Sequence, residues 1–206
     1  MANSPKAEET VSDSSWVSEA STLPVLGFAG SLRQASFNRA LLRAAQERAR
    51  AGMTIESFDL GRIPLYNRDV EKEGDPQPVQ HFKQALSAAA ALLIVTPEYQ
   101  HGIPGVLKNA LDWASRPPGD SPLQGKVAAV MGASTGMTGT ARAQAQLRQT
   151  LVYNDMLVVP SPEVLVARAR EKFDDELNLI DRDAVALIDK LLANLARLAR
   201  LLYADS

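Results

Sequence analysis

The feature that most constrains the fold is an uninterrupted apolar run at residues 91–95, Ala-Leu-Leu-Ile-Val. A strand with one face in water alternates apolar and polar side chains, whereas a strand covered on both faces is apolar throughout. Four other short strand-like segments occur along the chain. The expected strands are 25–29, 53–58, 91–95, 126–131 and 156–159.

The segments between these strands carry apolar residues at three- and four-residue spacing, which is typical of amphipathic helices. The expected helices are 37–51, 79–90, 103–114, 140–151 and one long helix at 174–203, and residues 64–78 are expected to form a loop. Strands that alternate with helices predict an α/β fold, with a doubly wound, five-stranded parallel sheet in a three-layer α/β/α arrangement.

The first 22 residues differ from the rest, because six serines are mixed with acidic residues there. A signal peptide needs a cationic start and an apolar run, and this segment has neither. We therefore expect a flexible N-terminal tail at 1–22 and one domain at 23–206.

Composition narrows the range of functions. The chain has no cysteine, only two histidines (His81 and His101) and a formal net charge of −2. Disulfides and thiolate nucleophiles are excluded, and a metal site is not expected. No basic tract favours nucleic acid, and no segment approaches the ~20 apolar residues of a membrane-spanning helix. We expect a cytoplasmic protein that acts on small molecules, without membrane insertion.

Ligands of doubly wound sheets bind at the carboxyl ends of the strands. The first loop in such a place, residues 30–38, combines several polar donors with the start of a helix, where unpaired N–H groups attract anions. The loop lacks the glycine-rich motifs of triphosphate and dinucleotide sites, so a single phosphate is the predicted ligand. The candidate phosphate-binding residues are Ser31, Arg33, Ser36 and Asn38. Alternatively, Ser36 only caps the helix.

The second loop, residues 96–105, follows the buried strand and is rich in proline and glycine. A flat ring needs an aromatic or apolar wall and hydrogen-bond partners along its edge. Tyr99 can supply the wall, and Gln100 with backbone N–H groups can supply the partners. The alternatives are a packing role for Tyr99 and an exposed, uninvolved His101.

The third loop contains Gly132-x-Ser134-x-Gly136, which matches the nucleophile elbow of α/β-hydrolases. That fold needs a histidine after the serine, and none follows His101. Ser134 would therefore lack a base. The small and hydroxyl-bearing residues Ser134, Thr135 and Gly136 are instead predicted to approach the third side of a planar ligand.

Together these loops resemble the NADPH-dependent FMN reductase family, which includes quinone, azo-dye and chromate reductases. The matching segments are 30–33 with Ser36 and Asn38, the run from Pro97 to Trp113, and 132–134 with Gly136. The resemblance implies a flavodoxin-like fold that binds FMN, with NADPH or NADH as co-substrate. It places the FMN phosphate in the first loop. Around the isoalloxazine ring it places Pro97, Glu98, Tyr99, Gln100, Ser134, Thr135 and Gly136. The family usually has asparagine at the position of Gln100.

The resemblance also implies how such a protein works. Hydride would pass from NADPH to the flavin and then, in a ping-pong cycle, to a flavin, quinone, azo compound or metal oxyanion, with no catalytic side chain. Arg116 is a candidate for binding the nicotinamide phosphate, although a surface ion pair is equally consistent. A homodimer or homotetramer is expected. The main alternative, a non-enzymatic electron carrier of the flavodoxin type, would present a strongly acidic face, unlike this nearly neutral chain.

Overall fold

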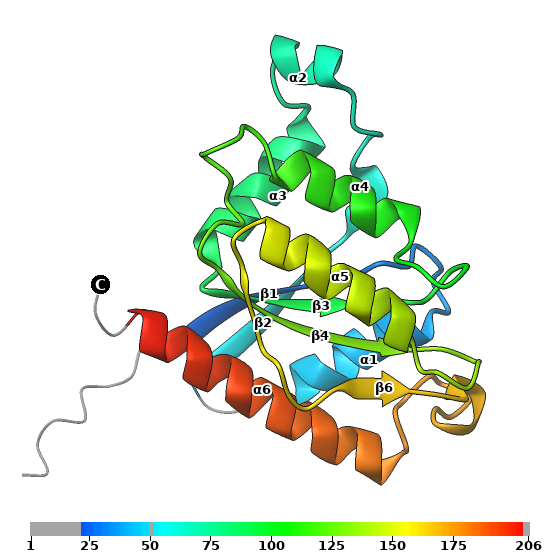
Figure 1. The fold of residues 1–206 in the computed structure, drawn as a ribbon. Coiled ribbons are helices and arrows are strands. Elements are labelled where there is room, and N and C mark those ends of the chain that lie inside the picture. Colours follow the sequence, from blue (N-terminus) through cyan, green and yellow to red (C-terminus); the bar gives the residue numbers. More distant parts are fainter. Residues whose placement is uncertain (1–21, 50–51, 204–206) are drawn as a thin grey trace, which may run out of the picture.

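The computed structural model describes residues 22–49 and 52–203, so the predicted tail, apart from Thr22, lies outside the described residues. A parallel sheet lies between two layers of helices (Figure 1). Its strands are β1 (Leu23–Ala29), β2 (Met53–Phe58), β3 (Ala91–Val95), β4 (Val127–Ala133), β5 (Leu157–Val158) and β6 (Val164–Val166). The helices are α1 (Phe37–Glu47), α2 (Arg68–Glu73), α3 (Gln77–Ala88), α4 (Gly105–Ala114), α5 (Ala141–Tyr153) and α6 (Arg182–Tyr203), with short 3₁₀ turns η1 (Leu60–Arg62) and η2 (Ala169–Glu171).

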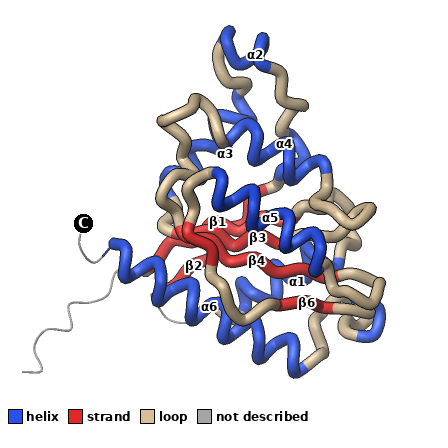
Figure 2. Tube along the Cα trace, in the orientation of Figure 1, coloured by secondary structure: helices blue, strands red, loops and turns tan. Residues whose placement is uncertain are grey.

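The strand order is β2-β1-β3-β4-β5, and every strand pair is parallel. This is the flavodoxin-like order of doubly wound sheets. Helices α1 and α6 cover one face, and α3, α4 and α5 cover the other (Figure 2). The predicted α/β class and its three layers are therefore confirmed.

Strand β3 shows why its run is apolar throughout. All five of its residues are buried, and they alternate between the two apolar layers. Leu93 and Val95 pack on the side of α1 and α6, while Leu92 and Ile94 pack on the side of α3 to α5. A polar side chain at any of these positions would lose its contact with water, which costs free energy unless a hydrogen bond replaces it.

The fifth strand differs from the prediction of one strand at 156–159. Two short strands, β5 and β6, pair in turn with the same edge of β4. Pro160 and Pro162 lie between them and have no N–H to donate, so regular pairing stops after the bond from Val159 N to Ala128 O, at 2.8 Å.

The last helix begins eight residues later than predicted, at Arg182. Asp181 caps it, because its carboxylate accepts a hydrogen bond from Ala184 N at 2.8 Å. Upstream, the Asp174 carboxylate accepts one from Asn178 N at 2.7 Å, and Leu177 has a left-handed φ of 62°. Leu177 therefore fits the apolar spacing of the helix without belonging to it.

Helix α2 lies where a plain loop was predicted, and it projects from the body of the molecule (Figure 1). Its start carries local signals of a helix N-terminus. Asn67 accepts a hydrogen bond from Asp69 N at 2.9 Å, and Asp69 and Glu71 place negative charge in the first turn.

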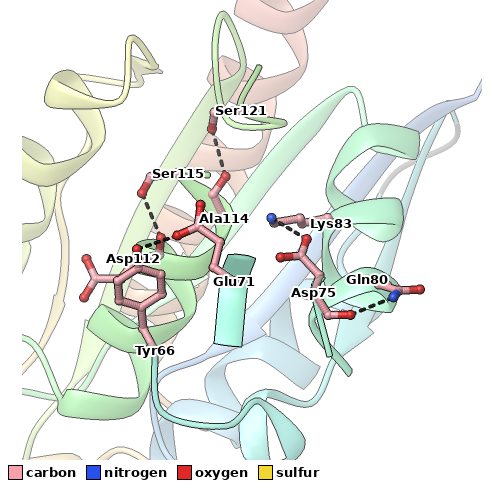
Figure 3. Close-up of polar contacts among 9 residues, drawn as sticks. All are labelled: Tyr66, Glu71, Asp75, Gln80, Lys83, Asp112, Ala114, Ser115 and Ser121. Atoms are coloured by element: carbon pink, nitrogen blue, oxygen red, sulfur yellow. Dashed lines mark hydrogen bonds and ion pairs between the residues drawn. The ribbon is translucent and has the colours of Figure 1, made fainter. Parts of the chain in front are cut away.

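The segment before α2 is fastened to α4. The oxygen and the nitrogen of the Asn109 side-chain amide are both hydrogen-bonded. Oδ1 accepts from Tyr66 N at 2.7 Å, and Nδ2 donates to Pro64 O at 2.8 Å. Figure 3 shows the Tyr66 hydroxyl group turned toward Glu71, to which it donates at 2.6 Å. The helix therefore has a fixed base despite its projecting position.

Strand β4 reaches a crowded junction at Gly132. A Cβ atom at this position would lie 2.2 Å from Thr140 Oγ1 and 2.3 Å from Thr96 O. The strand, the residue after β3 and the residue before α5 therefore approach so closely that only glycine fits.

We predict that Gly132→Ala lowers the free energy of unfolding by about 2–3 kcal/mol or more, because neighbouring backbone must shift. Urea denaturation measures this. Gly105→Ala is the control, because a Cβ at this first residue of α4 meets nothing within 4 Å and should leave stability unchanged or raised by up to about 1 kcal/mol. Equal denaturation midpoints for Gly132→Ala and the wild type would contradict the close approach of the backbone at this junction.

Candidate functional site

Three loops meet at the carboxyl ends of β1, β3 and β4, where the sequence placed them. They line one cavity of about 120 Å³. Its walls are formed by Ser31, Arg33, Ser36, Phe37, Asn38, Pro97, Glu98, Tyr99, Ala133, Ser134 and Thr135. All the predicted cofactor-binding residues are therefore brought together except Gln100 and Gly136. Phe37 and Ala133 were not singled out by sequence, because apolar side chains carry no sign of a ligand.

The first loop presents hydroxyl groups to the cavity. Ser36 is the N-cap of α1, and its Oγ accepts hydrogen bonds from Asn38 N at 3.2 Å and Arg39 N at 3.4 Å. The capping interpretation is therefore correct, yet the hydroxyl hydrogen is still available to another acceptor. The Ser31 side chain is buried at the wall and makes no hydrogen bond within the described part of the chain. Arg33 is exposed and donates to Ala35 O at 3.2 Å, so it folds back over its own loop.

Asn38 joins the first loop to the third. Its Nδ2 donates to Ala133 O and its Oδ1 accepts from Ala133 N, both at 2.9 Å. The side chain is buried, so each bond forms away from competing water. Asn38 therefore positions the end of β4 against the start of α1, and among the described residues the second hydrogen of its Nδ2 has no acceptor.

The second loop contains a tight turn. Tyr99 and Gly102 exchange two backbone hydrogen bonds of 3.0 Å, and the two residues between them both have left-handed φ angles, 50° at Gln100 and 65° at His101. Such turns favour asparagine and glycine. The exposed Gln100 side chain does not line the cavity. Its backbone is left-handed, a conformation that asparagine, the residue expected here from the resemblance, adopts more readily than glutamine.

The second loop is also fastened to α5. Gln146 Oε1 accepts a hydrogen bond from Ile103 N at 2.8 Å. A Cβ at Gly102 would meet the same oxygen at 2.8 Å, so the loop lies directly against the helix. No local sequence pattern predicts this contact, because the two residues are 43 positions apart.

Glu98 caps α5 from outside the helix. Its Oε2 accepts hydrogen bonds from Arg142 N at 2.9 Å and Ala143 N at 3.1 Å, while Thr140, the residue before the helix, makes no side-chain cap. Only 8% of the Glu98 side chain is exposed. Burial alone would raise the pKa of this carboxyl, but the two N–H donors and the nearby Arg142 guanidinium hold it below its usual value.

Tyr99 is the exposed aromatic residue of the site. Half of its surface, 51%, is in contact with solvent, so it is not a core packing residue. The cavity itself is smaller than the 300–1,000 Å³ usual for organic ligands. It therefore suits a phosphate group, and a flat ring attached to that group would lie outside the cavity on the side of Tyr99.

The third loop is held by the segment that follows β6. Gly136 O accepts from Arg168 N at 2.9 Å, and Ser134 O accepts from Ala169 N at 3.0 Å. Ser134 Oγ accepts from Gly136 N at 3.1 Å, which is its one side-chain hydrogen bond among the described residues. Because no base contacts Ser134, the arrangement offers no support for a hydrolase nucleophile.

Arg116 lies apart from the three loops. Its guanidinium stands 5.6 Å from the centre of the Tyr66 ring, at a cation–π distance. It lines a different hollow, beside Asp112 and Ser115 at the end of α4 (the latter two in Figure 3). Its predicted contact with the nicotinamide phosphate stays a prediction.

The chain matches the family model described as NADPH-dependent FMN reductase over residues 23–171. It is 49% identical over 170 residues to an "NAD(P)H-dependent FMN reductase" from Pseudomonas aeruginosa, which covers 82% of this chain and 91% of that protein. It belongs to the NADPH-dependent FMN reductase family.

Two further similar proteins support this assignment. A "2-hydroxy-1,4-benzoquinone reductase" from Burkholderia sp is 42% identical over 154 residues, which is 75% of this chain and 84% of that protein. The solved structure of FerB, a flavoenzyme NAD(P)H:(acceptor) oxidoreductase from Paracoccus denitrificans, superimposes with a TM-score of 0.77 at 30% identity and covers 85% of this chain and 98% of its own. The chain is therefore an FMN-dependent NAD(P)H oxidoreductase, and not an electron carrier without enzymatic activity or a serine hydrolase.

We predict that Glu98→Ala lowers the free energy of unfolding at pH 7 by about 1–2 kcal/mol, the usual cost of losing a helix cap. A depressed folded-state pKa means that this contribution is complete above the unfolded value of about 4.3 and is lost as the pH falls through the folded value. The difference between variant and wild type should therefore narrow in acid. Urea denaturation at several pH values measures it.

Glu73→Ala is the matched control, because Glu73 is exposed at the end of α2. It should change stability by less than about 0.5 kcal/mol. A Glu98→Ala difference that is absent at pH 7, or that does not depend on pH, would show that this carboxylate does not cap α5.

Proposed function

We propose that the three-loop cavity holds the phosphate end of FMN, and that the enzyme transfers reducing equivalents from NADPH to a small quinone-type acceptor. The observation that carries the proposal is the meeting of loops after β1, β3 and β4 around one cavity. Family membership supports the cofactor and the donor. The relative named as a 2-hydroxy-1,4-benzoquinone reductase supports the acceptor class.

The donors in the first loop fit a phosphate. Ser31 offers an unpaired hydroxyl, Ser36 offers its hydroxyl hydrogen, and Arg33 can reach forward from its weak bond to Ala35 O. Charged and neutral donors at a helix start are the usual surroundings of bound phosphate. Asn38 supports this group through Ala133.

The other two loops would border the ring. Pro97 and Tyr99 form one part of the wall, and Ser134 and Thr135 form another. Glu98 acts by fixing the second loop to α5, and Gln100 acts through the backbone of its turn. Backbone N–H groups of these loops can stabilise negative charge that develops at the ring edge.

Bound FMN would supply the redox chemistry by accepting a hydride from reduced nicotinamide and then passing two electrons to the acceptor. The chain itself binds, orients and shields, and we assign no side chain as nucleophile or base. An open site suits donor and acceptor that bind one after the other, in a ping-pong cycle. Flavins, azo compounds and metal oxyanions are further acceptors of the same electrons, and NADH is the alternative donor. The cytoplasm, where reduced nicotinamides are available, is the proposed compartment.

Flavin spectroscopy and steady-state kinetics test the function. Purified protein supplied with FMN should show the visible spectrum of a bound flavin, lose it on anaerobic mixing with NADPH, and regain it with a benzoquinone. Steady-state rates with both substrates varied should give parallel double-reciprocal lines. Intersecting lines would overturn the ping-pong order, and failure to bind FMN would overturn the proposal as a whole.

Arg33→Gln tests the phosphate end. Loss of one charged donor should weaken FMN affinity about tenfold or more, as measured by quenching of flavin fluorescence, with the unfolding midpoint unchanged. Arg68→Gln removes the same charge from the exposed start of α2 and should leave FMN affinity within about twofold. An unchanged affinity for Arg33→Gln would remove Arg33 from the site.

We also propose that the protein assembles as a homodimer or homotetramer through α4 and α5. Tyr153 and Val152, at the end of α5, are 88% and 64% exposed, and Tyr153 shares a hollow with Lys108 and Asp112 of α4. Exposed apolar side chains next to each other are typical of an interface.

Sedimentation equilibrium should give two or four times the chain mass of 22.2 kDa. Val152→Asp should shift the assembly toward the monomer, since a buried charge at an interface is costly. Ile180→Asp, at a 57% exposed position far along the chain, should leave the mass unchanged. A wild-type monomer at micromolar concentration would contradict the proposal.

A further inference from the structure

A second and larger hollow lies beside the first loop, between α1 and the end of β2. Its volume is about 550 Å³, within the range that organic ligands occupy. It is distinct from the three-loop cavity, but Ser31 and Ser36 line both. A ligand anchored at the first loop can therefore extend from one space into the other.

One wall of this hollow carries two arginines of α1, Arg39 and Arg43, spaced one helical turn apart. Arg43 is held in place, because its guanidinium donates to Leu177 O at 2.7 Å and lies 3.9 Å from the Glu47 carboxylate. The Arg39 guanidinium makes no hydrogen bond or ion pair within the described part of the chain, and it is exposed to the hollow. A planar guanidinium in this position is suited to a phosphate group.

The opposite wall is the end of β2. Asp59 Oδ1 accepts from Gly61 N at 3.0 Å, and its Oδ2 has no hydrogen bond among the described residues. In α/β folds that bind dinucleotides, an acidic residue beyond the second strand accepts hydrogen bonds from the ribose hydroxyls, while the loop after the first strand holds phosphate. Phe58, half-buried beside Asp59, adds an aromatic edge to the wall.

We propose that this hollow is an adenylate-binding subsite. Arg39, with Arg43, binds the phosphate, Asp59 accepts from the ribose hydroxyls, and the base lies against Phe58. The adenylate can come from two sources: the AMP half of FAD, whose FMN half would be held with its phosphate in the three-loop cavity, or the adenosine half of the nicotinamide donor. This proposal rests on the proposed FMN site only because Ser31 and Ser36 line both spaces.

The first experiment uses AMP as the probe, titrated calorimetrically into FMN-loaded protein. Wild-type protein should bind AMP saturably and more tightly than inorganic phosphate. Arg39→Gln should weaken AMP binding about tenfold, the effect of losing one charged hydrogen bond, whereas Arg68→Gln should not change it. Absence of AMP binding, or equal binding of AMP and inorganic phosphate, would overturn the assignment.

The ribose contact has its own test. Wild-type protein should prefer AMP to 2′-deoxy-AMP several-fold, and Asp59→Asn should abolish that preference while retaining binding through Arg39. A preference that persists in Asp59→Asn would remove Asp59 from the subsite. Circular dichroism of each variant checks that the fold is intact.

The third experiment separates the two sources. If FAD is the source, flavin-free protein binds FAD more tightly than FMN, and Arg39→Gln weakens FAD binding about tenfold while FMN binding changes less than twofold. If the donor is the source, FAD binds no better than FMN, AMP competes with NADPH, and Arg39→Gln raises the KM for NADPH without changing kcat. An Arg39→Gln variant with wild-type affinity for FAD and a wild-type KM for NADPH would overturn the subsite. Loss of FMN binding alone, with AMP binding intact, would count against the proposed function and not against this inference.

Discussion

The site depends on one buried side chain, Asn38, whose amide bonds both backbone groups of Ala133. Strands β1 and β4 are not neighbours, because β3 lies between them. The amide therefore joins the outer two of the three loops across the end of the middle strand. A buried amide with both groups paired is costly to disturb, since either partner left alone would lose its water without replacement. The separation between the first and the third loop is thereby fixed before any ligand arrives.

The middle loop is held by a different device. Glu98 and Gln146 connect it to α5 at two points, so a turn with two left-handed residues keeps a single shape. Glu98 and Gln100 thus shape this loop: the Glu98 carboxylate caps α5, and Gln100 has a left-handed backbone in the turn. Preorganised loops of this kind supply oriented N–H groups without reorganisation during the reaction.

The sequence was sufficient for the features that depend on local pattern. The apolar run 91–95 predicted a strand buried on both faces, and the carboxyl-end rule placed the three loops together. What it missed depends on partners far along the chain: Ala133 for Asn38, and the start of α5 for Glu98. The late start of α6 is a different case, because Asp181 is a local cap whose signal was outweighed by apolar spacing that continued through Leu177.

The divided fifth strand has a consequence for how copies of the chain can meet. An edge strand with free N–H and C=O groups invites another strand to pair with it, which leads to open-ended aggregation. Here that edge consists of two pieces of two and three residues, separated by a stretch with Pro160 and Pro162. Such an edge cannot serve as a template of useful length. Open-ended pairing through this edge of the sheet is thereby disfavoured.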